Sequence, residues 1–97
     1  MVAEMAKTIW FRSSMLGYGD ACRIARRVSR RRSWRLVVLH LPGTFETSTA
    51  ALARLVVLRR ELLRRGRDLR IVGLVGRARA LYEISRLENV LPQAAEA

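Results

Sequence analysis

The chain has 97 residues, 51% of them hydrophobic, so it is long enough to bury its own core and too apolar for a disordered segment. Its formal net charge is +11, and Lys7 is the only lysine among 19 basic residues. Acidic proteins, anionic lipid and nucleic acid are all compatible partners for an arginine-rich surface, but a GC-rich bacterial genome is the simpler explanation of the arginine bias. No continuous apolar run approaches the ~20 residues that a transmembrane helix needs.

Cysteine usage and the N-terminal composition bear on the compartment. Cys22 is the only cysteine, which excludes an intramolecular disulfide and fits a reducing environment. The first residues, MVAEMAKTIWFR, carry an early acidic residue and no sustained apolar stretch, so no signal peptide is expected. The sequence therefore predicts a soluble, cytoplasmic protein with a single domain over residues 1–97, which could associate peripherally with a membrane complex.

The N-terminal region predicts little regular structure. An Ile-Trp-Phe run favours a short strand over residues 7–12. A glycine-containing loop is expected over residues 13–19. Residues 1–18 are therefore predicted to form a reduced or atypical edge of the domain.

The first helix is predicted over residues 20–32. Apolar residues recur there at helical spacing, and arginines fill the remaining faces. Asp20 stands at the expected start, where a negative charge complements the helix dipole.

Two apolar strands flank a second predicted helix. Residues 34–41 and 69–74 are too continuously apolar for surface strands and suit the interior of a sheet. The helix over residues 51–65 follows from leucines at helical spacing and ends at Gly66. This spacing predicts two adjacent parallel strands joined by a right-handed crossover.

A third helix is predicted over residues 77–87, and the ordered chain is expected to end between Asn89 and Pro92. Four residues of this helix are predicted to pack inward: Ala78, Leu81, Ile84 and Ser85.

Three hydroxyl residues, Thr47, Ser48 and Thr49, precede the central helix. A side-chain oxygen there can accept a hydrogen bond from the unpaired amides of the first turn. The same position suits a phosphate, because the amides and the helix dipole stabilise negative charge. Capping and phosphorylation both remain open, with Thr49 and Ser48 as the phosphorylation candidates.

The sequence contains no constellation typical of an enzyme. There are no paired carboxylates, no Cys/His cluster with metal-ligand spacing and no nucleophile beside an evident base. His40, the only histidine, is expected to be structural or to face solvent, and Cys22 to be a small, partly buried residue. We therefore expect no enzymatic activity, no cofactor and no metal.

The stretch from Trp34 to Gln93 resembles the STAS family, the domain shared by sulfate transporters and bacterial anti-sigma factor antagonists. The family motif is Asp-Ser-Ser-Gly-Leu or Asp-Thr-Ala-Gly-Leu, followed by two small or apolar residues and a leucine. Residues 48–55, STAALARL, match its threonine, its alanine and both leucines, whereas Ser48 and Ala51 replace the aspartate and the glycine. The resemblance implies a small α/β domain with a mixed central sheet, parallel βαβ units and helices packed on it.

The resemblance also implies a function. The antagonists of the family are phosphorylated on the hydroxyl after the motif aspartate, which corresponds to Thr49, or to Ser48 in a register shifted by one residue. Such a protein is a non-enzymatic interaction module that binds an anti-sigma factor, often a kinase, and releases it on phosphorylation. A STAS subunit that binds the ATPase of a lipid-trafficking ABC transporter is the alternative. The expected partner surface is the loop and helix start at 44–54: Thr44, Phe45, Glu46, Thr47, Ser48, Thr49 and Arg54.

A nucleic-acid-binding protein is a further alternative from a different class. Arginines cluster between residues 23 and 35, but no helix-turn-helix or RNA-binding aromatic signature accompanies them. Nucleic acid is therefore expected only as a weak, non-specific partner whose binding falls with salt. The arginines in question are Arg23, Arg26, Arg27, Arg30, Arg31, Arg32 and Arg35.

Overall fold

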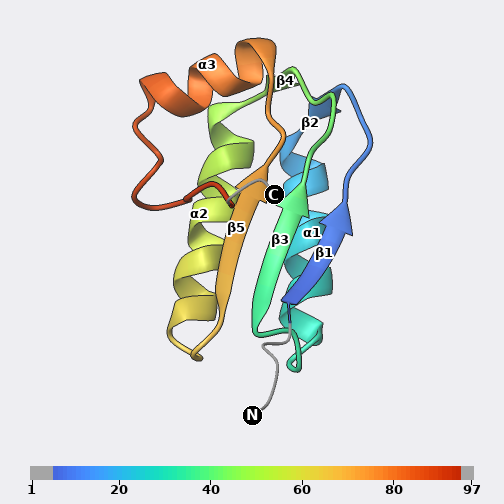
Figure 1. Ribbon diagram of the computed structural model, residues 1–97, viewed down its shortest axis with the longest axis vertical. Helices are drawn as coiled ribbons and strands as arrows, with labels where there is room; N and C mark the ends of the chain where they lie inside the picture. The colour runs from blue at the N-terminus through green and yellow to red at the C-terminus, as the bar shows by residue number, and fades with distance from the viewer. Residues whose placement is uncertain (1–5, 95–97) are drawn as a thin grey trace.

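A computed structural model describes residues 6–94, which form a small parallel β-sheet with two helices packed on one of its faces (Figure 1). The chain passes through eight elements and is built from two consecutive βαβ units. The elements are β1 (Ala6–Trp10), β2 (Met15–Leu16), α1 (Tyr18–Arg30), β3 (Leu36–His40), β4 (Glu46–Thr47), α2 (Thr49–Leu63), β5 (Asp68–Val72) and α3 (Gly76–Ile84).

The main sheet has the strand order β1-β3-β5, and both of its pairings are parallel. β2 and β4 form a second, two-residue parallel pair. The prediction that the two central apolar strands are adjacent and parallel is confirmed. The expected mixed sheet differs from what is seen: every strand pair within residues 6–94 is parallel, because α1 and α2 each form the crossover between neighbouring strands.

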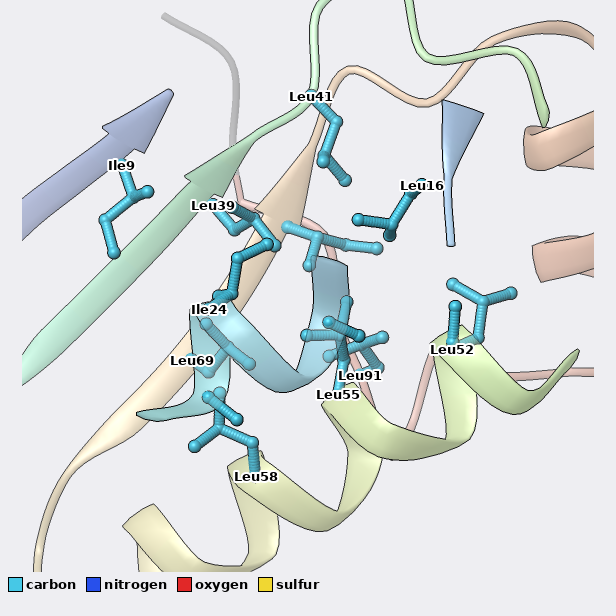
Figure 2. Close-up of a cluster of buried hydrophobic side chains, with 14 of the residues drawn as sticks. Ile9, Leu16, Ile24, Leu39, Leu41, Leu52, Leu55, Leu58, Leu69 and Leu91 are labelled. Carbon is cyan, nitrogen blue, oxygen red and sulfur yellow. The ribbon is translucent and has the colours of Figure 1, made fainter. Parts of the chain in front are cut away.

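The core lies between the sheet and the pair α1 and α2. Successive strand residues point to opposite faces of a sheet, so Ile9, Leu39 and Ile71, which are partners across the three strands, share the face that the helices cover. Figure 2 shows Ile9 and Leu39 on the same side as Ile24 of α1 and Leu55 of α2. These five side chains are at most 7% exposed.

The other face of the sheet is left open. Figure 1 views the sheet from this side, with α1 and α2 behind the strands, and no helix of the described residues covers it. Side chains of β3 on this side are only half-buried, and Trp10 is 50% exposed. We call this surface the open face, defined by Thr8, Trp10, Leu36, Val38, His40 and Arg70.

α1 begins at Tyr18, two residues before its predicted start. Gly17 is the N-cap, and its amide donates a hydrogen bond of 2.9 Å to the Asp20 carboxylate. Asp20 therefore lies inside the first turn, where it still complements the helix dipole. The predicted loop over residues 13–19 consequently contains β2 and the start of this helix.

α3 ends three residues earlier than predicted, and it packs through a different face. Ala78 and Tyr82 are its buried residues, whereas Ile84 is 78% exposed and Ser85 is also exposed. The predicted inward packing of Ile84 and Ser85 was therefore wrong. The Tyr82 hydroxyl donates a hydrogen bond of 2.6 Å to the Leu91 carbonyl oxygen, which holds the tyrosine side of the helix toward the core.

Ordered structure also continues past Pro92, contrary to the prediction. The Ile71 amide donates to the Pro92 carbonyl oxygen at 3.1 Å, and the Ala94 amide donates to the Ile71 carbonyl oxygen at 2.8 Å. The segment thereby forms a short parallel bridge, Ile71 to Gln93, along the outer edge of β5.

Burial, with a smaller contribution from the negative charge of Glu88, raises the pKa of Tyr82 above its ordinary value of 10.0. A raised pKa in the folded state gives stability that is complete below the unfolded pKa and is lost as the pH rises toward the folded pKa. We therefore expect the free energy of unfolding to fall more steeply above pH 10 in a protein with Tyr82 than in its Tyr82→Phe variant. Both proteins should carry Tyr18→Phe, so that the first has Tyr82 as its sole tyrosine and the second has no tyrosine. Urea unfolding across this pH range measures the slopes, and equal slopes would contradict the prediction.

Candidate functional site

The candidate site lies at the carboxyl ends of the parallel strands, where open α/β sheets place their binding sites. The loop after β3 is held here between two other segments. The Phe45 amide donates to the Ser14 carbonyl oxygen at 3.0 Å, and the Val75 amide donates to the Thr44 carbonyl oxygen at 3.1 Å. The Ala78 amide, in the first turn of α3, donates to the Phe45 carbonyl oxygen at 2.9 Å. This loop is therefore a fixed part of the fold.

Two of the predicted partner-binding residues have structural roles. Thr44 is fully buried, and its hydroxyl donates a hydrogen bond of 2.7 Å to the Ser13 carbonyl oxygen. The half-buried Thr47 donates in the same way to the Leu16 carbonyl oxygen, also at 2.7 Å. Thr44 thus cannot contact a partner directly, which corrects the sequence-based expectation. Both threonines fasten the loop to the β2 segment.

Ser48 is the residue that caps α2. Its backbone is extended, and its hydroxyl oxygen accepts a hydrogen bond of 3.0 Å from the Ala51 amide. The helix begins at the next residue, Thr49. Of the three hydroxyl residues before the predicted helix, Ser48 is therefore the one that satisfies an amide of the first turn.

Replacing Ser48 with alanine is expected to lower the free energy of unfolding by about 1 kcal/mol, since the Ala51 amide loses its acceptor. Urea unfolding measures the change. Thr49→Ala is the matched control, because it removes a neighbouring hydroxyl and leaves the cap in place. A loss for Thr49→Ala as large as that for Ser48→Ala would show that the cap is not the cause.

Thr49 is exposed in the first turn of α2. Within residues 6–94 its hydroxyl makes no hydrogen bond, unlike the hydroxyls of Thr44, Thr47 and Ser48. The unpaired amides and the positive end of the helix dipole surround this position, so a negative group added here is tolerated. Thr49 therefore combines an exposed hydroxyl with a position that accommodates negative charge.

Arg54, one turn further along α2, is only half-exposed. Its Nη1 is buried and has no hydrogen-bond partner among the described residues. It lies near the start of α1: a side-chain interaction with Cys22 raises the pKa of Tyr18, and the positive charge of Arg54 opposes that effect. Arg54 therefore belongs to the junction of α1 and α2 as much as to the surface.

Four large apolar side chains are exposed at this end of the molecule, and sequence reasoning named only one of them. They are Met15 (56% exposed), Tyr18 (54%), Phe45 (42%) and Val75 (46%), and we call them the apolar rim. The pairing of β2 with β4 and the backbone hydrogen bonds of the loop bring these segments together. Apolar residues in predicted loops were the only signal in the sequence. Clustered exposed apolar groups typically mark an interaction site.

A shallow hollow of about 350 Å³ adjoins the rim between the loop and α3. It is lined by Phe45, Glu46, Gly76 and Arg77. Gly76 has a φ of +56°, and a Cβ there would lie 3.2 Å from the Cβ of Phe45, so glycine lets the two segments approach. The carboxylate of Glu46 lies 4.0 Å from the guanidinium of Arg77, and both side chains are largely exposed.

Comparisons of the chain with protein-family models, with curated proteins and with solved structures found no match. Among the described residues, no helix combines the length and the apolar character that crossing a bilayer requires. Residues 6–94 also contain no group of three or more His, Cys, Asp or Glu side chains able to hold a metal ion. Cys22 is half-buried on α1, and His40 stacks on Trp10. The candidate site consists instead of an exposed apolar surface beside exposed hydroxyls.

Proposed function

We propose that the protein is a non-enzymatic interaction module that binds another protein through the apolar rim and the start of α2, as a bacterial anti-sigma factor antagonist does. The observation that carries the proposal is the position of Thr49. Its free, exposed hydroxyl lies at the same end of the molecule as four exposed apolar side chains. Aromatic side chains and methionine supply much of the binding energy at protein interfaces. The proposed site thus combines an apolar contact surface with Thr49, a residue that becomes negatively charged when it is phosphorylated.

Thr49 is the proposed phosphorylation site, in preference to Ser48. The Ser48 oxygen is already committed to the Ala51 amide, so modification there disturbs the cap. The Thr49 hydroxyl has no such role, and a phosphate on it lies beside the positive end of α2. Phosphorylation of Thr49 therefore leaves the fold intact while placing negative charge at the contact.

The alternative partner is the ATPase of a lipid-trafficking ABC transporter, as for a STAS subunit of such a complex. The same exposed surface serves either partner. Titration of the protein against a candidate anti-sigma factor and a candidate ATPase from its source organism separates the two. Only the true partner should bind with an affinity that falls when a residue of the apolar rim is replaced.

The role of the rim is tested by Phe45→Ser, with Val57→Ser as the matched control. Phe45 is 42% exposed in the rim, and Val57 is 43% exposed further along α2. We expect Phe45→Ser to weaken partner binding at least about tenfold in calorimetric titration, because it removes a central contact. Val57→Ser should bind as the wild type does. Equal affinities for these two variants would exclude the rim as the contact surface.

The role of Thr49 is tested with Thr49→Glu and Thr49→Ala against the same partner. Added negative charge in the contact should weaken binding of Thr49→Glu at least about tenfold, while circular dichroism remains unchanged. Thr49→Ala should bind normally and lose regulation by phosphorylation. If the wild type, Thr49→Glu and Thr49→Ala all bind the partner with equal affinity, Thr49 is not a switch, even if the rim is the contact surface.

A further inference from the structure

The open face is an unusual surface for a parallel sheet. Parallel strands are normally covered on both faces, because their crossover helices lie on both sides. Here α1 and α2 pack on the same side of the sheet, and the described chain leaves the other side open (Figure 1). This surface is distinct from the apolar rim, which lies beyond the carboxyl ends of the strands.

An aromatic platform lies at one end of the open face. Trp10 and His40 are partners across β1 and β3, and their rings stack with centroids 4.0 Å apart at an angle of 28°. The guanidinium of Arg12, an exposed residue, lies 4.8 Å from the centre of the Trp10 ring. Trp10 is nevertheless 50% exposed. Trp10 is thus an exposed aromatic ring with His40 stacked against it and the exposed Arg12 guanidinium over it. Such a ring is suited to a flat, negatively charged partner, which stacks on it when the Arg12 side chain moves aside to pair with the negative charge.

A hollow of about 620 Å³ occupies the other end of this face, and its size is that of a site for a small organic group. Its lining combines the apolar side chains of Leu36 and Val38 with the charged residues Arg35, Asp68 and Arg70. The Asp68 carboxylate is bound by Arg59 at 2.7 Å, so its charge is compensated from outside the hollow. The Nε of Arg70 also pairs with this carboxylate at 3.5 Å, but the Arg70 side chain is 43% exposed and a ligand can therefore reach it.

A second hollow, of about 400 Å³, is lined by arginines alone: Arg32, Arg65 and Arg67. Arg67 also lines the larger hollow, so the two adjoin. Two nitrogens of Arg67 are committed to backbone carbonyl groups, whereas Arg32 and Arg65 are exposed. The positive charge of the open face therefore continues past the amino-terminal start of β5, at the opposite end of the sheet from the apolar rim.

We propose that the open face binds single-stranded nucleic acid without sequence preference. Bases stack on Trp10 and lie over Leu36 and Val38, and the phosphates contact Arg35 and Arg70. The argument for this occupant is complementarity. Stacking platforms flanked by cations hold single strands, because every base has an aromatic face and every nucleotide carries a negative charge. A second copy of the chain fits poorly, since each copy brings a net charge of +11.

The test is a fluorescence anisotropy titration at physiological salt with labelled oligo-dT and a labelled duplex of the same length. We expect the single strand to bind more tightly than the duplex, whose bases are stacked internally and cannot reach Trp10. Trp10→Ala should weaken oligo-dT binding at least about fivefold, the loss corresponding to one stacked base, and Trp10→Phe should restore much of it. Circular dichroism of each variant checks the fold.

The arginine contacts are tested by a matched pair of variants, Arg70→Gln and Arg26→Gln. Both remove one positive charge, but Arg26 is exposed on α1, which packs on the opposite side of the sheet. Arg70→Gln should weaken binding and reduce the salt dependence by about one phosphate contact, with little effect from Arg26→Gln. This comparison keeps the proposal testable even if Trp10→Ala fails to fold.

Three results would overturn the proposal. The first is equal affinity for the single strand and the duplex. The second is an equal loss for Arg70→Gln and Arg26→Gln, which would show general attraction to polyanions. The third is Trp10-dependent binding to phosphatidylserine vesicles that oligo-dT does not displace, which would assign the face to anionic lipid. None of these results bears on the apolar rim, whose test uses Phe45→Ser.

Discussion

Replacing Arg67 with methionine is expected to lower the free energy of unfolding by about 3 kcal/mol. Arg67 is only 6% exposed. Its Nε donates to the Trp34 carbonyl oxygen at 2.8 Å, and its Nη2 donates to the carbonyl oxygens of Val28 at 2.9 Å and Arg31 at 2.8 Å. These acceptors belong to the last turn of α1 and the connection to β3, so the side chain fastens one βαβ unit to the next.

The size of this effect is set by two opposing contributions. Hydrogen bonds from a charged donor contribute about 1.5–3 kcal/mol each, and methionine leaves three carbonyl groups without them. Methionine also removes the cost of holding a charge away from water, and the same burial lowers the pKa of Arg67. The lost hydrogen bonds are expected to dominate, because the methionine side chain cannot satisfy the orphaned acceptors.

Urea unfolding of Arg67→Met and Arg65→Met measures this effect with a matched control. Arg65 is exposed, so its replacement should change the free energy of unfolding by no more than about 0.5 kcal/mol. Arg67→Lys should give an intermediate loss, because an ammonium group keeps the charge without the planar fork. Equal unfolding midpoints for the two methionine variants would show that the hydrogen bonds of Arg67 add nothing to stability.

Replacing Gly73 with alanine is expected to cost at least about 3 kcal/mol, for two separate reasons. Gly73 has a φ of +104°, a conformation that an L-residue adopts only under strain. A Cβ at this position would also lie 3.0 Å from the carbonyl carbon of Leu41 and 3.1 Å from its oxygen. Both contacts are with backbone atoms at the end of β3, which cannot move aside as a side-chain tip can.

Gly43→Ala is the control that separates strain from contact. Gly43 has a φ of +78°, but a Cβ there would meet no atom within 4 Å. Its replacement should therefore show the backbone cost alone, about 1–2 kcal/mol. The difference between the two variants in the free energy of unfolding measures the clash with Leu41. If Gly43→Ala proves as damaging as Gly73→Ala, close approach of the strands is not the reason for glycine at 73.

The elements that could be predicted from the sequence are those specified by local patterns. Two continuous apolar runs predicted β3, β5 and their parallel adjacency. Leucines at helical spacing predicted α2, and the hydroxyl cluster before it predicted a cap, which Ser48 provides. At the candidate site, the exposed positions of Ser48, Thr49 and Phe45 also agree with the expected surface. These features depend on residues close together in the chain, so their signals are present in a short window.

What could not be predicted depends on contacts between distant parts of the chain. Thr44 has the sequence context of a surface loop residue, but it is buried, and its hydroxyl donates to the carbonyl oxygen of Ser13, 31 positions away. Arg67 reads as one more charge of a basic surface, yet its acceptor in Trp34 lies 33 positions away. Met15 and Val75 become neighbours of the site only through the pairing of their segments with the loop. No window around any one of these residues contains its partner.

The two edge strands of the main sheet, β1 and β5, are not equivalent, and this limits how the protein can polymerise by strand addition. On the β5 side, the Leu69 amide is taken by the Asp68 carboxylate and the Ile71 amide by the Pro92 carbonyl oxygen. On the other side of the sheet, no strand of the described residues pairs with the outer edge of β1. A fibre that grows by edge-to-edge strand pairing requires every subunit to have two unpaired edge strands, one on each side of its sheet. Within residues 6–94 only the β1 edge is free to accept an added strand, so strand addition there can occur once and offers no second edge from which a fibre could extend.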